Sequence, residues 1–271
     1  MRRDNQDTLI LGYHEITGTP SRKRYAITEG EFREQLLWIR ENHFQVIALR
    51  DLSRALSRSG DLPARSIVLT FDDGHLSNYR TAYPLIRSLG YTGCFFAPVD
   101  LIGREDYMNW DQLRELIRGG MEIGSHGLYH RFLDSMPAGR VMQELAGSKK
   151  VLEERLRVPV DFFSIPRGYC RKDLREMARQ AGYSLVCTSA FGYSNTRSPP
   201  MSLHRFVIRN GFSLEYFSRI LRKDPRASFQ IRMNEAIHAA CRHLIGVAGF
   251  ERLRGHVFKE EYGSTELPFP E

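Results

Sequence analysis

Ser66-Ile67-Val68-Leu69-Thr70-Phe71-Asp72-Asp73-Gly74 is the stretch from which the fold is best predicted. Five of its first six residues are apolar or β-branched, which predicts a buried strand that ends in a polar turn. Successive side chains that leave a strand point in opposite directions. Asp72 and Asp73 can therefore share a cleft and do different work, one holding a cation and the other handling a proton. Asp-Asp-Gly is also the composition of an ordinary hydrophilic turn.

The composition is that of an ordinary globular protein. The chain has 271 residues, 42% hydrophobic and 26% charged, enough for one large domain or two small ones. It has no apolar run of the roughly 18 residues that a spanning helix needs, and no hydrophobic N-terminal segment long enough for a signal peptide. We therefore expect no transmembrane segment and a cytoplasmic location.

The charge pattern does not indicate a nucleic-acid partner. The net charge is +7, but the 39 basic residues are mixed along the chain with 32 acidic ones. The four cysteines show no CxxC spacing, and Cys94 and Cys187 fall in apolar runs, so we expect buried free thiols. The sequence does not indicate an oligomeric state.

Short apolar runs alternate with amphipathic segments from residue 9 to residue 208. The predicted strands are 9–13, 44–49, 67–71, 94–97, 121–124, 162–165, 184–187 and 203–208. The predicted helices are 29–42, 51–59, 77–89, 110–117, 140–156 and 173–181. This alternation predicts an α/β fold, an irregular (β/α) barrel of about seven or eight parallel strands. An open doubly wound sheet is the alternative, but no phosphate-binding glycine loop follows an early strand.

The pattern changes after residue 212. Two helices are predicted there, at 214–221 and 229–244, and a polar loop is predicted between the first strand and the first helix. We therefore divide the chain into a barrel domain at 8–212 and a C-terminal helical extension with a tail at 213–271.

Active sites of such barrels lie at the carboxyl ends of the strands. The polar residues expected there are His14, Asp72 with Asp73, Ser125 with His126, the segment from Pro166 to Tyr169, and His204. His126 and His130 are four residues apart, so they can share a cation through their imidazole nitrogens. Together with Asp73 they make a ligand set that leaves a position for water, which is typical of a catalytic zinc site.

Three ordered motifs resemble those of the polysaccharide deacetylases, carbohydrate esterase family 4. They are Thr70–Gly74, the HxxxH pair at His126 and His130, and Phe163–Gly168. Weaker likeness extends the resemblance to about residues 8–208. It implies a metal-dependent hydrolase with an irregular (β/α) barrel that removes acyl groups, usually acetyl, from an N-acetylated carbohydrate. The implied cofactor is a divalent metal, foremost Zn²⁺, with Co²⁺, Ni²⁺ or Mn²⁺ as the other candidates.

The resemblance assigns roles to single residues. It makes Asp73, His126 and His130 the metal ligands and Asp72 the general base. It also implies a segment that binds the substrate and the oxyanion, formed by Pro166, Arg167, Gly168 and Tyr169. In that segment the backbone N–H of Arg167 would face the oxyanion, and Tyr169 could stack on a sugar ring. Trp110 is a second candidate for stacking, with core packing as the alternative.

The chain departs from the family pattern at three places. Gly127 stands where a hydroxyl residue usually follows the first histidine, and the arginine that precedes the motif-three proline in many members is absent at Ser164 and Ile165. The late Leu-x-His motif, which often supplies the general acid, is out of register by one residue at Leu203-His204-Arg205. We therefore consider His204 and His14 as candidates for the acid. His75 is a third, for which an ordinary surface or core role is the simpler interpretation.

Two other functions are compatible with these motifs. One is deacylation of a small-molecule, nucleotide-linked or lipid-linked sugar amide, which would suit a chain without a signal peptide. The other is a catalytically silent sugar-binding homologue that retains the barrel. The complete set of ligands and base favours catalysis over silence, because sugar binding alone does not need them.

Overall fold

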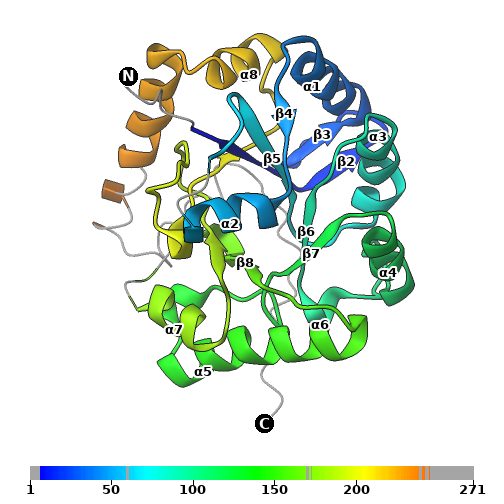
Figure 1. The fold of residues 1–271 in the computed structure, drawn as a ribbon, viewed down its shortest axis with the longest axis vertical. Coiled ribbons are helices and arrows are strands. Elements are labelled where there is room, and N and C mark those ends of the chain that lie inside the picture. The colour runs from blue at the N-terminus through cyan, green and yellow to red at the C-terminus, as the bar shows by residue number, and fades with distance from the viewer. Residues whose placement is uncertain are drawn as a thin grey trace.

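The computed structural model describes residues 7–58, 61–168, 171, 173–237, 240–241 and 244. Helices surround a strongly curled sheet of parallel strands (Figure 1). The strands of this sheet are β1 (Leu9–Tyr13), β4 (Gln45–Val46), β5 (Ser66–Phe71), β6 (Cys94–Ala97), β7 (Glu122–Ser125), β8 (Phe162–Ser164), β9 (Leu185–Cys187) and β10 (Phe206–Val207). The helices are α1 (Glu29–Glu41), α2 (Leu49–Arg58), α3 (Tyr83–Ser88), α4 (Trp110–Arg118), α5 (Ala138–Met142), α6 (Ser148–Leu156), α7 (Leu174–Gln180) and α8 (Leu214–Leu221).

The sheet curls until its last strand lies beside its first. Its order is β10-β1-β5-β6-β7-β8-β9, and β10 pairs in parallel with β1. On the other side, the Leu203 N–H donates to the Val186 carbonyl and the Arg205 N–H to the Ala190 carbonyl, each at 2.8 Å. Residues 203–207 thus connect β9 with β1. The prediction of an irregular (β/α) barrel is confirmed, and the open sheet is excluded.

The irregularity of the barrel arises at β5. The amino end of β5 pairs with β4 at Ser66 and Ile67, whereas its carboxyl end pairs with β6 at Thr70 and Phe71. Only Gln45 and Val46 are in register with β5, so the strand predicted at 44–49 is reduced to two residues. β4 is therefore a side branch of the sheet.

Alternation along the strands separates two hydrophobic layers. Ile10, Val68 and Phe96 belong to a cluster in the barrel interior, whereas their neighbours Leu11 and Leu69 pack in the larger cluster beneath the surrounding helices. This is the period-two pattern expected of strands that are covered on both faces. Each strand therefore presents every second side chain to the barrel axis.

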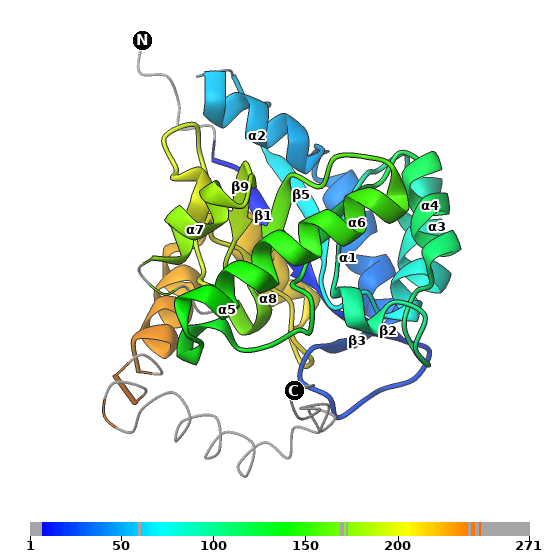
Figure 2. The same ribbon diagram turned by 90° about the horizontal axis from the view of Figure 1, so that it is seen from below.

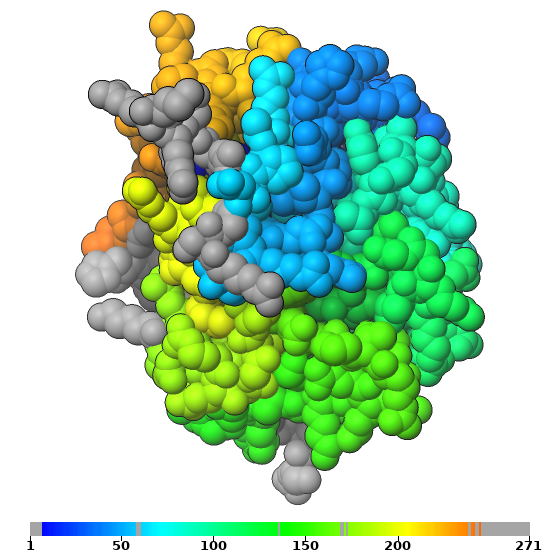
Figure 3. Space-filling view, in the orientation of Figure 1, coloured from blue at the N-terminus to red at the C-terminus, as the bar shows by residue number. Residues whose placement is uncertain are grey.

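Helix α2 covers one end of the barrel. Figure 2 shows α2 at that end and strands β2 and β3 toward the other, and the space-filling view shows α2, in blue, packed over the face (Figure 3). Leu49 and Leu52 of α2 join the interior cluster. The Glu122 carboxylate, at the start of β7, accepts the N–H groups of Leu49 and Arg50 at 2.7 and 3.0 Å. The amino ends of the strands are therefore covered, and the polar residues collect at their carboxyl ends.

Several local features differ from the prediction. The polar loop after β1 contains two short parallel strands, β2 (Glu15–Thr17) and β3 (Ala26–Thr28). The helix predicted at 77–89 divides into a π-helical turn at Asn78–Ala82 followed by α3. The second helix of the C-terminal extension begins at residue 225, not 229, and part of its predicted course to 244 lies outside the described residues.

The helix predicted at 140–156 is likewise divided, by a π-helical turn at Gln143–Gly147 between α5 and α6. The other helix predictions agree with the structure within a few residues, and α8 coincides with the predicted 214–221. The boundary between the barrel and the extension at 212 stays a prediction. Within the described part of the chain, every helix falls short of the length and apolar character that crossing a bilayer requires.

Candidate active site

Four strands deliver polar residues to one rim of the barrel. Tyr13 and Phe71 are register partners at the ends of β1 and β5, so His14 and Asp72 follow side by side. The Asp72 N–H continues the ladder by donating to the Tyr13 carbonyl at 2.8 Å. β7 ends next to His126, whose backbone N–H donates to the Ala97 carbonyl at 3.1 Å.

Asp73, His126 and His130 converge at this rim. Asp73 Oδ1 lies 3.2 Å from His126 Nε2 and 3.1 Å from His130 Nε2. The three ligand atoms lie within 4.8 Å of one another. The other ring nitrogen of His126, Nδ1, is 2.7 Å from the Ser164 carbonyl. A proton on Nδ1 leaves the lone pair of Nε2 available to bind a cation, the usual arrangement for a metal-binding histidine. The residues fit a divalent cation with one carboxylate and two imidazole ligands.

Two of the three candidate ligands have left-handed backbone. The φ angle is 67° at Asp73 and 53° at His130, a region that costs non-glycine residues free energy. At Asp73 this conformation, continued by Gly74 with φ 67°, breaks the strand alternation. Asp72 and Asp73 can therefore serve one site although they are adjacent.

The base candidate Asp72 is buried and paired with an arginine that sequence reasoning missed. Arg205 Nη1 lies 2.8 Å from Asp72 Oδ1, and Nη2 lies 2.7 Å from Oδ2. Arg205 Nη2 also donates to Ser164 Oγ at 3.0 Å, and this hydroxyl donates to Asp72 Oδ2 at 3.2 Å. An arginine is absent just before Pro166, where many family members have one, and Arg205, from the chain just before β10, pairs with Asp72 instead. Every second side chain of residues 203–207 points into the barrel, and this alternation was the sequence signal that could have placed Arg205 inside.

The charges around Asp72 and Asp73 keep both carboxylates ionised. Burial alone would raise the pKa of Asp72, but the Arg205 guanidinium and the neighbouring His126 outweigh it and hold the pKa at about 2. Burial likewise opposes ionisation of Asp73, whose pKa is nevertheless well below its usual value because His130 and His126 lie against it. Ionised carboxylates at both positions suit a cation ligand next to a proton acceptor.

His14 is the histidine closest to the base candidate. His14 Nε2 lies 4.0 Å from Asp72 Oδ2, and its ring stacks on Tyr25 with centroids 4.7 Å apart. Burial lowers the pKa of His14, and the positive charges of Arg205 and His126 add to this, against the opposing effect of the two aspartates. His14 therefore lies beside Asp72, and stacking on Tyr25 fixes the plane of its ring.

The other two histidine candidates lie elsewhere. His204 is exposed and lies on the outward side of residues 203–207. Successive side chains of an extended segment point to opposite faces, so His204 points outward because its neighbour Arg205 points inward. His75 lies with Nε2 3.7 Å from Glu15 Oε1 and Nδ1 3.0 Å from Ser77 Oγ. Neither is brought to the Asp72 carboxylate.

The segment after β8 forms a tight turn at the same rim. Pro166–Gly168 is a kinked turn in which Arg167 and Gly168 have φ of 61° and 75°. The Arg167 guanidinium lies 5.9 Å from the centre of the Phe132 ring. Tyr169, the predicted sugar platform, lies outside the described residues. Trp110 starts α4 and packs partly buried against the core, with the Arg155 guanidinium 5.8 Å from its ring, which agrees with the packing alternative.

Comparisons with known proteins point to one family. Residues 59–186 match the family model for polysaccharide deacetylases. The chain is 26% identical over 204 residues to YxkH of Bacillus subtilis (strain 168), which is named for that family, covering 75% of this chain and 72% of YxkH. It is 23% identical over 275 residues to the poly-β-1,6-N-acetyl-D-glucosamine N-deacetylase of Escherichia coli (strain K12). That alignment covers 83% of this chain but only 41% of the longer E. coli protein.

A solved structure shows the same fold. The deacetylase PplD of Streptococcus pyogenes, solved in complex with acetate, superimposes with a TM-score of 0.74 at 23% identity. The superposition covers 79% of this chain and 98% of PplD. The barrel, the ordered motifs and these relatives agree in one likeness: this chain is similar to the polysaccharide deacetylases, whose family model matches residues 59–186.

Proposed function

We propose that the protein is a metal-dependent hydrolase that removes N-linked acyl groups, foremost acetyl, from a carbohydrate. The observation that carries this proposal is an ionised carboxylate, Asp72, fixed beside a convergent set of three ligands, Asp73, His126 and His130. A carbohydrate substrate is supported by the names of the relatives, which include deacetylases of poly-β-1,6-N-acetyl-D-glucosamine. A barrel of this kind also serves many other reactions, so the site rather than the fold supports this activity.

Asp73, His126 and His130 would hold the cation. A mixed set of one carboxylate and two imidazoles suits Zn²⁺ first, and Co²⁺, Ni²⁺ or Mn²⁺ as alternatives. When bound, such a cation lowers the pKa of water toward neutrality and polarises the carbonyl of the scissile amide.

The protein residues would carry out the proton transfers. Asp72 accepts the proton of the attacking water, and Arg205 keeps its carboxylate ionised and oriented for that step. His14 Nε2 lies 4.0 Å from Asp72 Oδ2, and in the proposed step His14 takes up the proton from Asp72 and delivers it to the leaving amine. The Arg167 N–H is the proposed donor to the oxyanion, and Tyr169 the proposed sugar platform.

The test is an acetate-release assay on N-acetylated polymers, oligosaccharides and nucleotide-linked or lipid-linked sugars, with and without a chelator. Metal content is measured on the same samples. We expect chelator-sensitive release from at least one carbohydrate. Release only from small or carrier-linked sugars would assign a small substrate instead of a polymer. Binding of a glycan without turnover by the metal-loaded protein would contradict the proposed hydrolysis and indicate a sugar-binding homologue.

A further inference from the structure

We propose that Glu144 is a positioning residue of the metal site, which fixes the backbone between the two histidine ligands. The proposal depends on the proposed function only for the assignment of His126 and His130 to a cation. Glu144 is not a ligand, and it acts through the main chain that joins the ligands.

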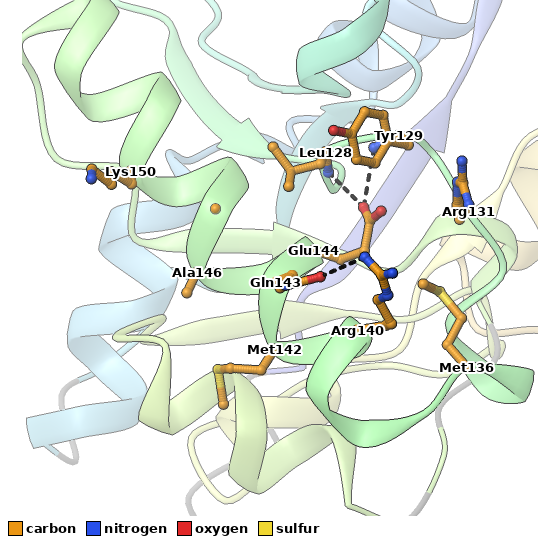
Figure 4. Close-up of a pocket in the computed structure, with 11 residues that line it drawn as sticks. Leu128, Tyr129, Arg131, Met136, Arg140, Met142, Gln143, Glu144, Ala146 and Lys150 are labelled. Atoms are coloured by element: carbon orange, nitrogen blue, oxygen red, sulfur yellow. Dashed lines mark hydrogen bonds between the residues drawn. The ribbon is translucent and has the colours of Figure 1, made fainter. Parts of the chain in front are cut away.

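The contacts of Glu144 reach the centre of the HxxxH segment. Its Oε2 accepts the N–H of Leu128 at 2.7 Å and the N–H of Tyr129 at 3.1 Å (Figure 4). These are the two residues just before His130. Glu144 lies in the helical segment Gln143–Gly147 and is only 2% exposed. Hydrogen bonds from backbone N–H groups to an ionised carboxylate are among the stronger ones in proteins.

The backbone of this segment needs such support. His130 has φ 53°, and Gly127 has φ 85°, so both lie in the left-handed region. Strained conformations of this kind persist only where the surroundings hold them. With two N–H groups bound to one oxygen, the chain between His126 and His130 is tied to a buried side chain of the segment Gln143–Gly147, which would fix the spacing of the two Nε2 atoms.

Gly127 and Glu144 depend on each other. A Cβ at residue 127 would lie 2.9 Å from Glu144 Oε2, closer than side chains normally approach. The N–H of Gly127 is bound to Ser125 Oγ at 3.2 Å. Any residue with a side chain at position 127 would therefore bring its Cβ against the carboxylate. Glu144 holds the N–H groups of this loop, while the N–H groups of Val99 and Asp100 donate to its carbonyls at Gly127 and Leu128, at 3.1 and 2.8 Å.

A pocket of about 550 Å³ gives water access to this side of the loop. It is lined by Glu144 together with Leu128, Tyr129, Met136 and Met142, among others (Figure 4). Asp73, His126 and His130 are not among its lining residues. Water can enter such a space and replace part of the hydrogen bonding when the carboxylate is removed. Substitution at Glu144 can therefore be tested in a folded protein.

The experiment measures metal affinity directly, by competition with a chromophoric zinc chelator. We expect Glu144→Ala to weaken Zn²⁺ binding about 10- to 100-fold, the usual effect of losing a group that orients ligands. Glu144→Gln is expected to stay within a few-fold of the wild type, because both N–H groups donate to a single oxygen that Gln can supply. Glu144→Asp, one methylene shorter, is expected to lose most of the affinity, and it replaces the alanine variant if that variant does not fold.

Glu122→Ala is the matched control. Glu122 is also a buried glutamate that accepts two backbone N–H groups, from Leu49 and Arg50, but it lies at the amino ends of the strands. We expect it to lower stability without changing Zn²⁺ affinity. Unchanged affinity in Glu144→Ala, or an equal loss in Glu122→Ala, would overturn the proposal. Weaker binding in Glu144→Ala in a protein that releases no acetate would refute the proposed function and leave this inference intact.

A second test uses the close contact between a Cβ at residue 127 and the Glu144 carboxylate. Gly127→Ala alone carries both the backbone strain and the contact with Glu144, whereas Gly127→Ala in a Glu144→Ala background carries only the strain. We expect the zinc affinity lost through Gly127→Ala to be smaller in that background, a coupling that a double-mutant cycle measures. Equal losses in both backgrounds would show that the two residues act independently, against the proposal.

Discussion

Arg205 and Asp72 form a buried ion pair with two nearly parallel hydrogen bonds, 2.8 Å from Nη1 to Oδ1 and 2.7 Å from Nη2 to Oδ2. The two residues are 133 positions apart in the chain. Arg205 also donates from Nε to the Thr188 carbonyl at 2.8 Å, so its own guanidinium plane is fixed. Bidentate pairing of this kind sets both the charge and the direction of a carboxylate.

Arg205→Met is expected to reduce both turnover and stability. It leaves the Asp72 carboxylate buried without its partner, which typically costs about 3–5 kcal/mol of unfolding free energy. Urea unfolding with a chelator present measures the cost. The double variant Asp72→Asn with Arg205→Met should recover much of the stability and none of the turnover. A double variant as unstable as Arg205→Met would contradict the ion-pair explanation.

Asp72→Asn should keep the metal and lose deacetylation. The amide cannot accept the proton of water, so we expect kcat to fall about 10²- to 10⁴-fold. Asp73→Ala and His130→Ala should lose the metal together with the activity. Elemental analysis and acetate release on the same preparations separate the two classes. Full turnover in Asp72→Asn would remove this residue from the role of base.

Metal removal should lower the thermal stability of the proteins that keep all three candidate ligands, and not of those that lack one. A cation that binds only the folded state adds stability in proportion to the logarithm of its concentration over its Kd. We expect added Zn²⁺ to raise the melting temperature of the chelator-treated wild type and of Asp72→Asn. The same addition should leave His130→Ala nearly unchanged. Calorimetry at several zinc concentrations is the measurement, and an equal shift in all three proteins would indicate binding elsewhere.

His14 and His204 provide a matched pair for the general acid. His14→Ala should lower kcat with little change in metal content, because it lies 4.0 Å from Asp72 and is not among the three ligands. His204→Ala should leave kcat near the wild-type value, since that side chain is exposed away from the site. The opposite ranking would return His204 to the mechanism.

The buried thiols give a pH-dependent test of the barrel interior. Burial raises the pKa of Cys187 to about 12 and the pKa of Cys94 well above its usual value, because the thiolate would lose its hydration. The reactive thiolate therefore stays scarce at pH 7–9 in the folded protein, and its fraction rises only as pH approaches the raised pKa. Alkylation mapped by mass spectrometry should label both cysteines only after unfolding. Rapid labelling of Cys187 at pH 8 would contradict the closed interior.

Much of the barrel could be predicted because its strands are continuous apolar runs that end at polar residues. β1 and β6 coincide with their predicted ranges. The convergence of Asp73, His126 and His130 could also be predicted, because the spacing of the two histidines and the turn at Asp73 are local features. The two short strands β2 and β3 could not, since three-residue segments carry too little pattern to distinguish them from a loop.

The partner of the base could not be found by motif comparison. Its position depends on how residues 203–207 are inserted between β9 and β1, which is a tertiary relationship. The motif comparison directed attention to His204, whereas strand parity turns its neighbour Arg205 inward. The support of the HxxxH segment by Glu144 was hidden for the same reason, because it joins residues that no sequence motif connects.

The closing strand has a consequence for biosynthesis. A nascent chain that has not yet placed residues 203–207 between the first and ninth strands contains Asp72 and the three candidate ligands, but lacks the guanidinium that pairs with Asp72. Under the proposed function, we therefore expect hydrolysis to begin only when the ring is complete, and a fragment truncated before residue 203 to release no acetate.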